Sequence, residues 1–404
     1  MLIPIPDAIS MIFQNLHTLS SEEINIEYAM GRVLAEDVIS DIDMPPFDKS
    51  AVDGYAVKIK DIPGTLPISE IIQAGDIPKN PLEDGKAAFV MTGAPIPEGT
   101  EAVVMREHTK EAADKVEILS KPKPGANIAY RGEDIKKGEI VIRKGKIISI
   151  ATVSLLATLG IRKVKVSELP NVAVMVTGSE LVEPGERPIK GGYIYNANGY
   201  SLQAACRDIG IEPHYLGIVK DDLESIVNAL KSVEKSDIVL ISGGVSMGEY
   251  DYVKEAVIKS GGEVVFHKVA IKPGKPFLFA KKGKQLIFGM PGNPVSVMVG
   301  FWKFIRPTIY KMQGADEVFP TRVPAYFKGI YKKKSDRPHY ISVKLKKDGD
   351  KLLAAYIKSN GSADVPAFEK GDGMIEVPKD TTLLEDGERV EVMLLKLPRE
   401  KNER

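Results

Sequence analysis

The sequence has little of what several common protein classes require. Its 404 residues include a single cysteine, Cys206, which excludes a disulfide framework within the chain and any thiolate metal cluster. The five histidines are scattered and show no HExxH or other paired ligand spacing. Basic and acidic residues number 55 each, so the chain lacks the basic surplus that broad nucleic-acid binding needs.

Long apolar runs are also missing. No stretch reaches the roughly 18 apolar residues of a membrane-spanning helix, and the opening segment MLIPIPDAIS lacks the basic region of a signal peptide. We therefore expect a cytoplasmic protein with no membrane contact and no nucleic-acid partner. Apolar residues nevertheless make up 43% of the chain, which is ample for real cores. The length predicts about two to four domains.

The spacing of apolar residues changes along the chain. Apolar residues at helical spacing predict a helix within 5–17, and a second short helix is expected over 21–32. From about 55 to 140, short apolar runs separated by turn residues predict a small β domain. Helical spacing returns over 149–161.

From residue 171 onward, predicted strands and helices alternate. The last helix of this series follows Asn293 and Pro294, which are typical of an N-cap and a first helical position. Such a βαβ series predicts a largely parallel sheet covered by helices. After about residue 316 the helical periods end, and several short apolar runs predict a small C-terminal β domain.

Three predicted strands end in segments rich in glycine, hydroxyl and acidic residues: TGSEL, SGGVSMGEYD and GMPGNPVS. Because ligands of open α/β sheets lie beyond the carboxyl ends of the strands, we expect these segments to converge. Glycine lets backbone N–H groups approach an anion closely, whereas carboxylates need a divalent cation between themselves and that anion. The pattern predicts phosphate-ester chemistry with Mg²⁺ as cofactor.

Other nucleotide sites do not fit the sequence. It contains neither GxxxxGK[ST] nor GxGxxG, which argues against a P-loop and against a dinucleotide-binding Rossmann site. A Gly-Gly pair after a strand is most often an ordinary turn, so the prediction depends on three segments rather than one. Lys268, Lys272 and Lys275 surround a Pro-Gly turn between two predicted strands. Clustered ammonium groups near glycine-rich anion-binding segments would bind an oxyanion or phosphates.

The first half of the chain has three further loops of this kind. MPPFDKSAVDGYAV, MTGAPIPEGTEAVV and YRGEDIKKGE place Asp53, Thr92, Arg131 and Asp134 on turns fixed by proline and glycine. Each loop alone fits an ordinary turn. Their density of acids and hydroxyl groups favours a functional site.

Together with ISGGVSMGEYDY, KVAIKPGKPFLF and FGMPGNPVSVMV, these motifs resemble the MoeA family of molybdopterin molybdenumtransferases. The same motifs occur in the E domains of gephyrin and its plant counterpart. The resemblance covers about residues 5–398 and is weakest in the C-terminal domain. It implies a multidomain α/β plus β fold. The parts would be an elongated N-terminal domain (1–45 and 140–168), an inserted β domain (46–139), a MogA-like α/β sandwich that binds molybdopterin (169–315), and a C-terminal β-barrel-like domain (316–404).

The resemblance implies that molybdate or tungstate is inserted into adenylylated molybdopterin, with Mg²⁺-assisted release of AMP. Catalytic roles would fall to Asp53, Thr92, Asp134, Glu180, Asp251, Lys268 and Lys272. Substrate binding would fall to Arg131, Gly243, Gly244, Ser246, Lys275, Asn293, Ser296, Arg337 and Ser362. Metal binding would fall to Glu180, Asp251 and either Asp221 or Asp222. Ser179 stands where other members carry an aspartate, which leaves one carboxylate fewer near the metal.

The resemblance also implies partners. Family members are homodimers, so Asp53, Thr92, Arg131 and Asp134 would reach the site from the other subunit. A MogA- or MoaB-type adenylyltransferase is a further expected partner. Two alternatives stay open: the chain adenylylates molybdopterin itself, or it acts as an E-type scaffold. Molybdate and tungstate have the same charge and nearly the same size, so the residues do not distinguish them.

Overall fold

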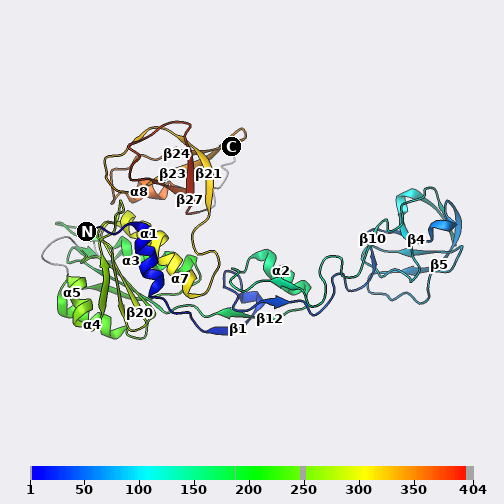
Figure 1. Ribbon diagram of the computed structural model, residues 1–404, viewed down its shortest axis with the longest axis horizontal. Helices are drawn as coiled ribbons and strands as arrows, with labels where there is room; N and C mark the ends of the chain where they lie inside the picture. Colours follow the sequence, from blue (N-terminus) through cyan, green and yellow to red (C-terminus); the bar gives the residue numbers. More distant parts are fainter. Residues whose placement is uncertain (1, 187, 246–251, 397–404) are drawn as a thin grey trace. The chain divides into compact units, whose positions relative to one another are not determined.

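The computed structural model describes residues 2–186, 188–245 and 252–396 (Figure 1). The chain divides into two compact units. The first unit comprises Met1–Ala35, Gly145–Ile150 and Lys163–Arg404, and the second comprises Glu36–Lys144 and Ala151–Arg162.

A six-stranded sheet is the centre of the first unit. In order across the sheet its strands are β16 (His214–Val219), β13 (Val172–Thr177), β17 (Ile238–Ser242), β20 (Gln285–Met290), β19 (Leu278–Lys282) and β18 (Glu263–His267). The first four strands run parallel, and β19 and β18 are antiparallel to their neighbours. Strands β13, β17 and β20 are buried along their whole length, as expected for a sheet covered on both faces.

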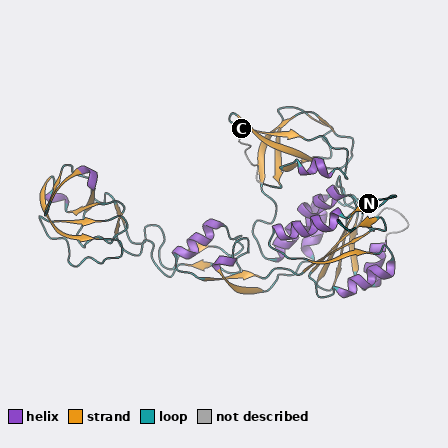
Figure 2. Ribbon diagram, turned by 180° about the vertical axis from the view of Figure 1, so that it is seen from behind, coloured by secondary structure: helices purple, strands orange, loops and turns teal. Residues whose placement is uncertain are grey.

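Helices cover both faces of this sheet, as Figure 2 shows from behind. One layer contains α1 (Ile5–Gln14), α3 (Ala197–Asp208), α6 (Pro294–Gly300) and α7 (Arg306–Met312), and the other contains α4 (Leu223–Ser232) and α5 (Tyr252–Lys259). A π-helical segment, Phe301–Ile305, joins α6 to α7, so the long closing helix predicted after Asn293 is present. Each layer forms its own apolar core against the sheet.

A closed five-stranded barrel forms the C-terminal part of the first unit. Its strands, in order, are β21 (Arg322–Lys328), β24 (Lys351–Tyr356), β23 (His339–Asp348), β25 (Gly373–Val377) and β27 (Arg389–Leu394). The interior is apolar, because residues such as Phe327, Val343 and Val392 alternate with outward-facing side chains. The barrel also carries α8 (Val365–Glu369) and a short ladder of β22 (Tyr331–Lys332) with β26 (Leu383–Leu384).

The second unit contains another six-stranded sheet. Its strands, in order, are β7 (Ala102–Met105), β4 (Gly54–Val57), β6 (Ala87–Val90), β5 (Gly64–Ile72), β9 (Lys115–Ile118) and β8 (Thr109–Ala112). Smaller elements of this unit are β2 (Val38–Ile39), β11 (Ile140–Ile142), β3 (Lys49–Ser50), β10 (Ile128–Ala129), η2 (Ile59–Asp61), η3 (Arg106–His108) and most of α2 (Ile150–Thr158). Apolar side chains pack on both faces of the sheet.

The helix predicted over 21–32 is wrong. Residues Ser21–Asn25 form β1, which pairs antiparallel with β12 (Lys163–Ser167), and only a short 3-10 helix, η1 (Ile26–Tyr28), follows. Cross-strand pairing explains the difference: Ile24 lies opposite Val164, and Lys163 forms an ion pair with Glu23 at 3.0 Å. Contacts from a distant segment therefore outweigh the local helical preference.

The predicted fold class is confirmed. A helix-covered, largely parallel sheet, a separate β unit and a C-terminal barrel are all present. A short pair, β14 (Leu181–Val182) with β15 (Ile194–Tyr195), completes the elements of the first unit. Among the helices in the described part of the chain, none has both the length and the apolar character needed to cross a membrane.

Candidate active site

The carboxyl ends of the parallel strands surround a pocket of about 360 Å³, here called the strand-end pocket. The described residues of the three segments singled out in the sequence do converge there. Its lining includes Thr177 and Glu180 after β13, Asp221 after β16, Ser242, Gly243 and Gly244 after β17, Gly292 and Asn293 after β20, and Asn198 at the start of α3. The shared edge of a parallel sheet produces this meeting of segments that are far apart in sequence.

The Gly-Gly pair after β17 is required by close packing and backbone conformation. A Cβ atom on Gly243 would lie 2.0 Å from the carbonyl oxygen of Thr177, and the φ of Gly243 is +95°. Gly244 has a φ of +62°, and a Cβ there would lie 2.8 Å from Oγ1 of Thr177 and 3.3 Å from Oδ1 of Asp221. Neither position accepts a side chain without displacing a wall of the pocket.

Asp221 and Asp222 have different surroundings. Asp222 is the N-cap of α4: its Oδ1 accepts a hydrogen bond from the Ser225 amide at 2.8 Å, and its Oδ2 lies 3.1 Å from Nζ of Lys220. The Ser225 amide hydrogen bond, helped by Lys220, lowers the pKa of Asp222. Asp221 instead lines the strand-end pocket. Of the two candidate ligands, the structure brings only Asp221 to the pocket.

Three oxygen atoms of pocket-lining side chains are buried without a hydrogen-bond partner in the described part of the chain. They are Oγ1 of Thr177, Oδ1 of Asn198 and Oδ1 of Asp221. A buried polar atom without a partner is costly, so its presence indicates a ligand or ion. Oxygen atoms of this kind suit a hard divalent cation. Within the described residues no group of three or more His, Cys, Asp or Glu side chains is arranged for a metal ion.

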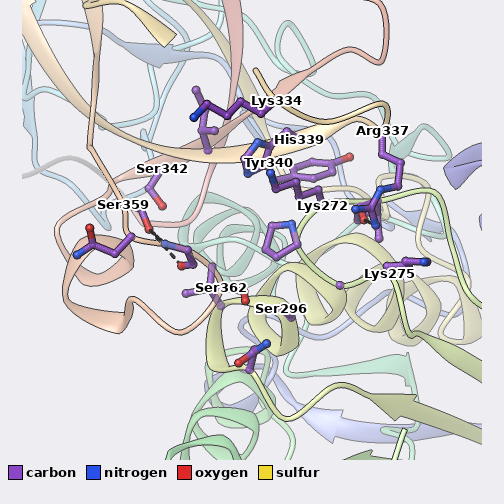
Figure 3. A pocket seen from close by; sticks show the side chains of 18 of the residues that line it. Lys272, Lys275, Ser296, Lys334, Arg337, His339, Tyr340, Ser342, Ser359 and Ser362 are labelled. Carbon is purple, nitrogen blue, oxygen red and sulfur yellow. Dashed lines mark hydrogen bonds between the residues drawn. The ribbon is translucent and has the colours of Figure 1, made fainter. Parts of the chain in front are cut away.

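A second pocket, of about 730 Å³, lies within the first unit between the helix-covered parallel sheet and the barrel. It is strongly basic. Figure 3 shows Lys272, Lys275 and Arg337 toward one side, Ser342, Ser359 and Ser362 toward the other, and Ser296 below. Lys332 and Lys334 also line this basic pocket, and the described residues that line it include no Asp or Glu. Such a pocket offers cations and hydroxyl donors to an anion, and the lining residues place no carboxylate against it.

Backbone hydrogen bonds hold the two walls of the basic pocket together. The Lys272 amide donates to the Pro338 carbonyl at 2.9 Å, and the Tyr340 amide donates to the Lys272 carbonyl at 2.8 Å. The Arg337 guanidinium donates through Nη1 to the carbonyl of Ile271 at 3.2 Å. The cationic side chains are therefore attached to segments that backbone hydrogen bonds hold together.

His339 lies in the wall of the basic pocket. Its Nδ1 is hydrogen-bonded to the hydroxyl of Tyr331. Burial, together with the positive charge of Lys272, lowers the pKa of His339 to about 4. The imidazole is therefore neutral at physiological pH, and the pocket's permanent charge comes from lysine and arginine.

The two pockets adjoin. Pro276, Pro291 and Asn293 line both of them. Asn293 occupies the N-cap position of α6, as predicted, although its side chain makes no capping hydrogen bond. A ligand that fills the strand-end pocket would thus present one end to the cations of the basic pocket.

In the second unit, the three polar loops converge on one another. Oδ1 of Asp53 accepts hydrogen bonds from the Thr92 amide at 2.6 Å and from its hydroxyl at 2.8 Å. The Thr92 amide and hydroxyl lower the pKa of Asp53. Arg131 donates through Nε to Asp43 at 2.7 Å, and its amide donates to Asp48 at 2.8 Å. The Asp134 amide donates to the carbonyl of Met44 at 2.9 Å.

Asp53, Thr92, Arg131 and Asp134 form one group of predicted site residues in the second unit, and Asp222 caps α4. The other predicted residues fall into four groups. The strand-end pocket holds Glu180, Asp221, Gly243, Gly244 and Asn293. The basic pocket holds Lys272, Lys275, Ser296, Arg337 and Ser362, and also Asn293. Lys268 lines neither pocket: its amide bonds to the Phe277 carbonyl, and its φ is +90°. Ser246 and Asp251 lie outside the described residues.

Sequence reasoning missed several lining residues. Asn198, Tyr331, Lys334 and His339 were not singled out, yet each lines one of the two pockets. The run KKKSDRPHY was the available signal for Lys334 and His339, because it concentrates charge on a loop, and Tyr331 immediately precedes it. Asn198 gave no such signal, since a second asparagine, Asn196, caps the same helix through the Gly199 amide.

Three family models together match most of the chain. The MoeA N-terminal region (domain I and II) matches residues 3–160, the probable molybdopterin binding domain matches 173–311, and the MoeA C-terminal region (domain IV) matches 325–395. A molybdopterin molybdenumtransferase of Staphylococcus aureus is 35% identical over 85% of this chain and 83% of its own. The chain belongs to the MoeA family. The resemblance inferred from the motifs is therefore confirmed.

Other members of the MoeA family agree with this assignment. A molybdopterin molybdenumtransferase of Haemophilus influenzae is 40% identical over 77% of this chain and 76% of its own. The crystal structure of a molybdopterin biosynthesis moeA protein from Pyrococcus horikoshii OT3 is 35% identical and matches with a TM-score of 0.85. It covers 98% of this chain and 100% of that one.

Proposed function

We propose that this MoeA-family chain is a molybdopterin molybdenumtransferase in molybdenum cofactor biosynthesis. It would take adenylylated molybdopterin and molybdate, or tungstate, and release AMP. The observation that carries the proposal is the pair of adjoining pockets: one is lined by glycines and oxygen ligands, and the other by cations without a lining carboxylate. The curated relatives that bear the name molybdopterin molybdenumtransferase support the same reaction.

The basic pocket would hold the oxyanion. Lys272, Lys275 and Arg337 offset the charge of a tetrahedral dianion, and the Ser296 hydroxyl can donate to one of its oxygens. Both molybdate and tungstate carry no proton at neutral pH, so they need donors and no acceptor. An oxygen of the dianion would replace AMP at the terminal phosphate of the pterin, while the lysines neutralise the charge that develops.

The strand-end pocket would hold the diphosphate and Mg²⁺. The residues present fit a hard cation, because Asp221 offers a buried oxygen that no described residue hydrogen-bonds, and Glu180 lines the same pocket. Glu180 and Asp221 would bind the ion, which would neutralise charge on the phosphates and on the leaving AMP. Backbone amides at Gly243 and Gly244 can approach the phosphate oxygens closely.

A homodimer would complete the site. Asp53, Thr92 and Arg131 form a hydrogen-bonded polar surface in the second unit, and two large apolar side chains flank it: Phe47 is 41% exposed and Tyr130 is 48% exposed. Exposed apolar side chains around a polar cluster are typical of a surface that meets a partner. We therefore propose that this surface faces the strand-end pocket of the other subunit. A separate adenylyltransferase would supply the adenylylated substrate.

The test is AMP release from adenylylated molybdopterin with Mg²⁺, measured with and without molybdate or tungstate. Release that depends on the oxyanion, with the metal retained on the pterin, is the expected result and shows which metal is taken. Release without oxyanion dependence would contradict the transferase. Formation of adenylylated molybdopterin from ATP and molybdopterin would instead establish the adenylyltransferase, and a folded dimer without either reaction would point to a scaffold.

A further inference from the structure

The strand-end pocket has more oxygen ligands than the two carboxylates Glu180 and Asp221. Asn198 is 9% exposed and Thr177 is 3% exposed, and both line the pocket. Each has one buried oxygen without a hydrogen-bond partner among the described residues, as does Asp221. Three such atoms around one pocket indicate that the pocket is arranged for a ligand that interacts with side-chain oxygen atoms.

The Asn198 amide is fixed in one orientation. Its Nδ2 donates to the Gly292 carbonyl at 2.7 Å and to Oγ of Ser242 at 2.9 Å. A carbonyl can only accept, so the nitrogen must face Gly292, and both amide N–H groups are used. The remaining atom, Oδ1, is a pure acceptor. An acceptor held in this way is suited to a cation or to a water bound to one.

Thr177 is placed by the strand that it ends. Its carbonyl packs against Gly243, and its hydroxyl lies 2.8 Å from the position that a Cβ of Gly244 would occupy. Oδ1 of Asp221 lies 3.3 Å from the same position, so the hydroxyl and the carboxylate approach one point in the pocket. A methyl carbon of Val253 lies 2.9 Å from the same position, so only a residue without a Cβ fits between these three side chains.

We propose that Thr177 and Asn198 complete the divalent cation site, acting with Asp221 and Glu180 on the ion and its bound waters. Mg²⁺ keeps several waters when it binds to proteins and takes only one or two carboxylates, so neutral oxygens that hold those waters complete its shell. The inference rests on the proposed function for the identity of the cation. It goes beyond that function in assigning two neutral residues that set the cation's affinity.

The probe is Mn²⁺ alone, titrated into the full-length chain while free Mn²⁺ is followed by electron paramagnetic resonance. Thr177→Val keeps the shape of the side chain and removes only the unpartnered hydroxyl. Asn198→Ala removes the fixed acceptor. Each is expected to weaken Mn²⁺ binding by about 10- to 100-fold, the usual effect of removing an atom that orients or supports a metal ligand.

The control is Thr308→Val on α7. Thr308 is fully buried, and its hydroxyl donates to the Phe304 carbonyl at 2.7 Å, well separated in sequence from the pocket segments. This variant should lose thermal stability and keep wild-type Mn²⁺ affinity, whereas Thr177→Val should keep its melting temperature because no hydrogen bond is lost. The two variants should therefore show opposite effects on melting temperature and on Mn²⁺ affinity, and this contrast distinguishes a ligand role from a structural role.

The proposal would be overturned if both pocket variants bound Mn²⁺ with wild-type affinity, or if the wild-type chain bound no Mn²⁺ at millimolar concentration. It would also be overturned if both variants kept Mn²⁺ binding but bound adenylylated molybdopterin more weakly in the presence of EDTA. The last would assign the oxygens to N–H groups of the substrate. Loss of Mn²⁺ binding in the variants supports the site even if AMP release fails, so the cation site and the proposed function can fail separately.

Discussion

Asp221 and Asp222 are consecutive in the chain, but only one of them can receive a ligand. The Asp222 carboxylate caps α4 through the Ser225 amide, with Lys220 at its second oxygen. The Asp221 carboxylate lines the strand-end pocket, and its Oδ1 is buried with no hydrogen-bond partner among the described residues. One residue therefore stabilises the helix, and its neighbour leaves a charge unsatisfied in a pocket.

Asp221→Asn should lower Mg²⁺-dependent turnover by about 100-fold or more, because a ligand charge is lost. Its melting temperature should equal or exceed that of the wild type, since the substitution replaces a carboxylate with one buried oxygen that has no partner among the described residues by a neutral amide. Asp222→Ala should show the opposite pattern: turnover close to wild type and a melting temperature lower by a few degrees, because a helix cap is lost. Steady-state AMP release and thermal unfolding check both. Equal effects of the two variants on turnover would contradict the assignment.

Mixing two inactive variants tests the shared site. Asp53→Asn removes a carboxylate of the second unit, and Asp221→Asn removes one of the first. If subunits exchange freely, half of the dimers formed from equal amounts are mixed, and each mixed dimer has one site without either substitution. We expect about a quarter of wild-type AMP release to return.

The control for this experiment is a chain that carries both substitutions. Mixed in equal amount with the wild type, it should lower activity to about half of the wild-type contribution, because half of the wild-type chains enter mixed dimers and every site of a mixed dimer contains one altered carboxylate. Light scattering should show dimers in all samples. If activity does not return although exchange of labelled subunits is demonstrated, the site lies within one subunit.

Arg337→Ala should weaken molybdate binding by roughly 10- to 100-fold, because it removes a charged hydrogen-bond donor that the Ile271 carbonyl holds in place. Calorimetric titration with molybdate measures the effect. Lys328→Ala is the matched control. It removes a cation from the same barrel that does not line the basic pocket. Lys328 is paired with Asp386 at 3.1 Å, much as Arg337 is paired with Asp336 at 3.5 Å. An equal loss of molybdate affinity in both variants would mean that affinity depends on the net charge of the protein rather than on contacts in the basic pocket.

Much of the site could be predicted from the sequence because it follows from one geometric rule. Thr177, Gly243 and Asn293 come directly after apolar runs, and parallel strands bring their carboxyl ends to one edge. The choice between Asp221 and Asp222 could not be predicted, since it depends on which residue begins α4. Cross-strand contacts with Lys163–Ser167 likewise decided that Ser21–Asn25 is a strand rather than a helix.

The sequence does not indicate which barrel residues form a wall of the basic pocket. Tyr331 and His339 lie about sixty residues beyond the KPGK turn, and they meet it only because the barrel closes and the Lys272 and Tyr340 backbones pair. Nothing in the local pattern of either segment indicates the other. Short strands with alternating burial predict a barrel, but they do not fix which of its loops faces a neighbouring domain.

His339 makes stability depend on pH. Its pKa of about 4 in the folded chain lies below the ordinary value of 6.5, so between these values the unfolded chain binds more protons. The stability that this group contributes is therefore present above pH 6.5 and is lost as pH falls toward 4. His339→Gln should flatten the dependence of melting temperature on pH across that window, as thermal unfolding at several pH values would show.

A bound dianion should change the titration of His339 in a defined direction. Negative charge in the basic pocket favours the imidazolium, so molybdate should raise the pKa of His339 from about 4 toward its ordinary value. Imidazole NMR signals followed with and without molybdate measure this, and signals that His339→Gln removes identify the group. A pKa unchanged by saturating molybdate would place the anion away from His339.

Gly243→Ala should be far more damaging than a comparable change elsewhere. Its Cβ would lie 2.0 Å from the Thr177 carbonyl oxygen, so we expect a loss of about 4 kcal/mol or more in the free energy of unfolding, or failure to fold. Gly261→Ala is the control: its φ of +85° is similar, but nothing lies within 4 Å of its Cβ position. That variant should lose only about 1–2 kcal/mol, the cost of the left-handed backbone alone. Denaturant unfolding compares the two, and similar losses would mean that conformation rather than the Thr177 contact requires the glycine.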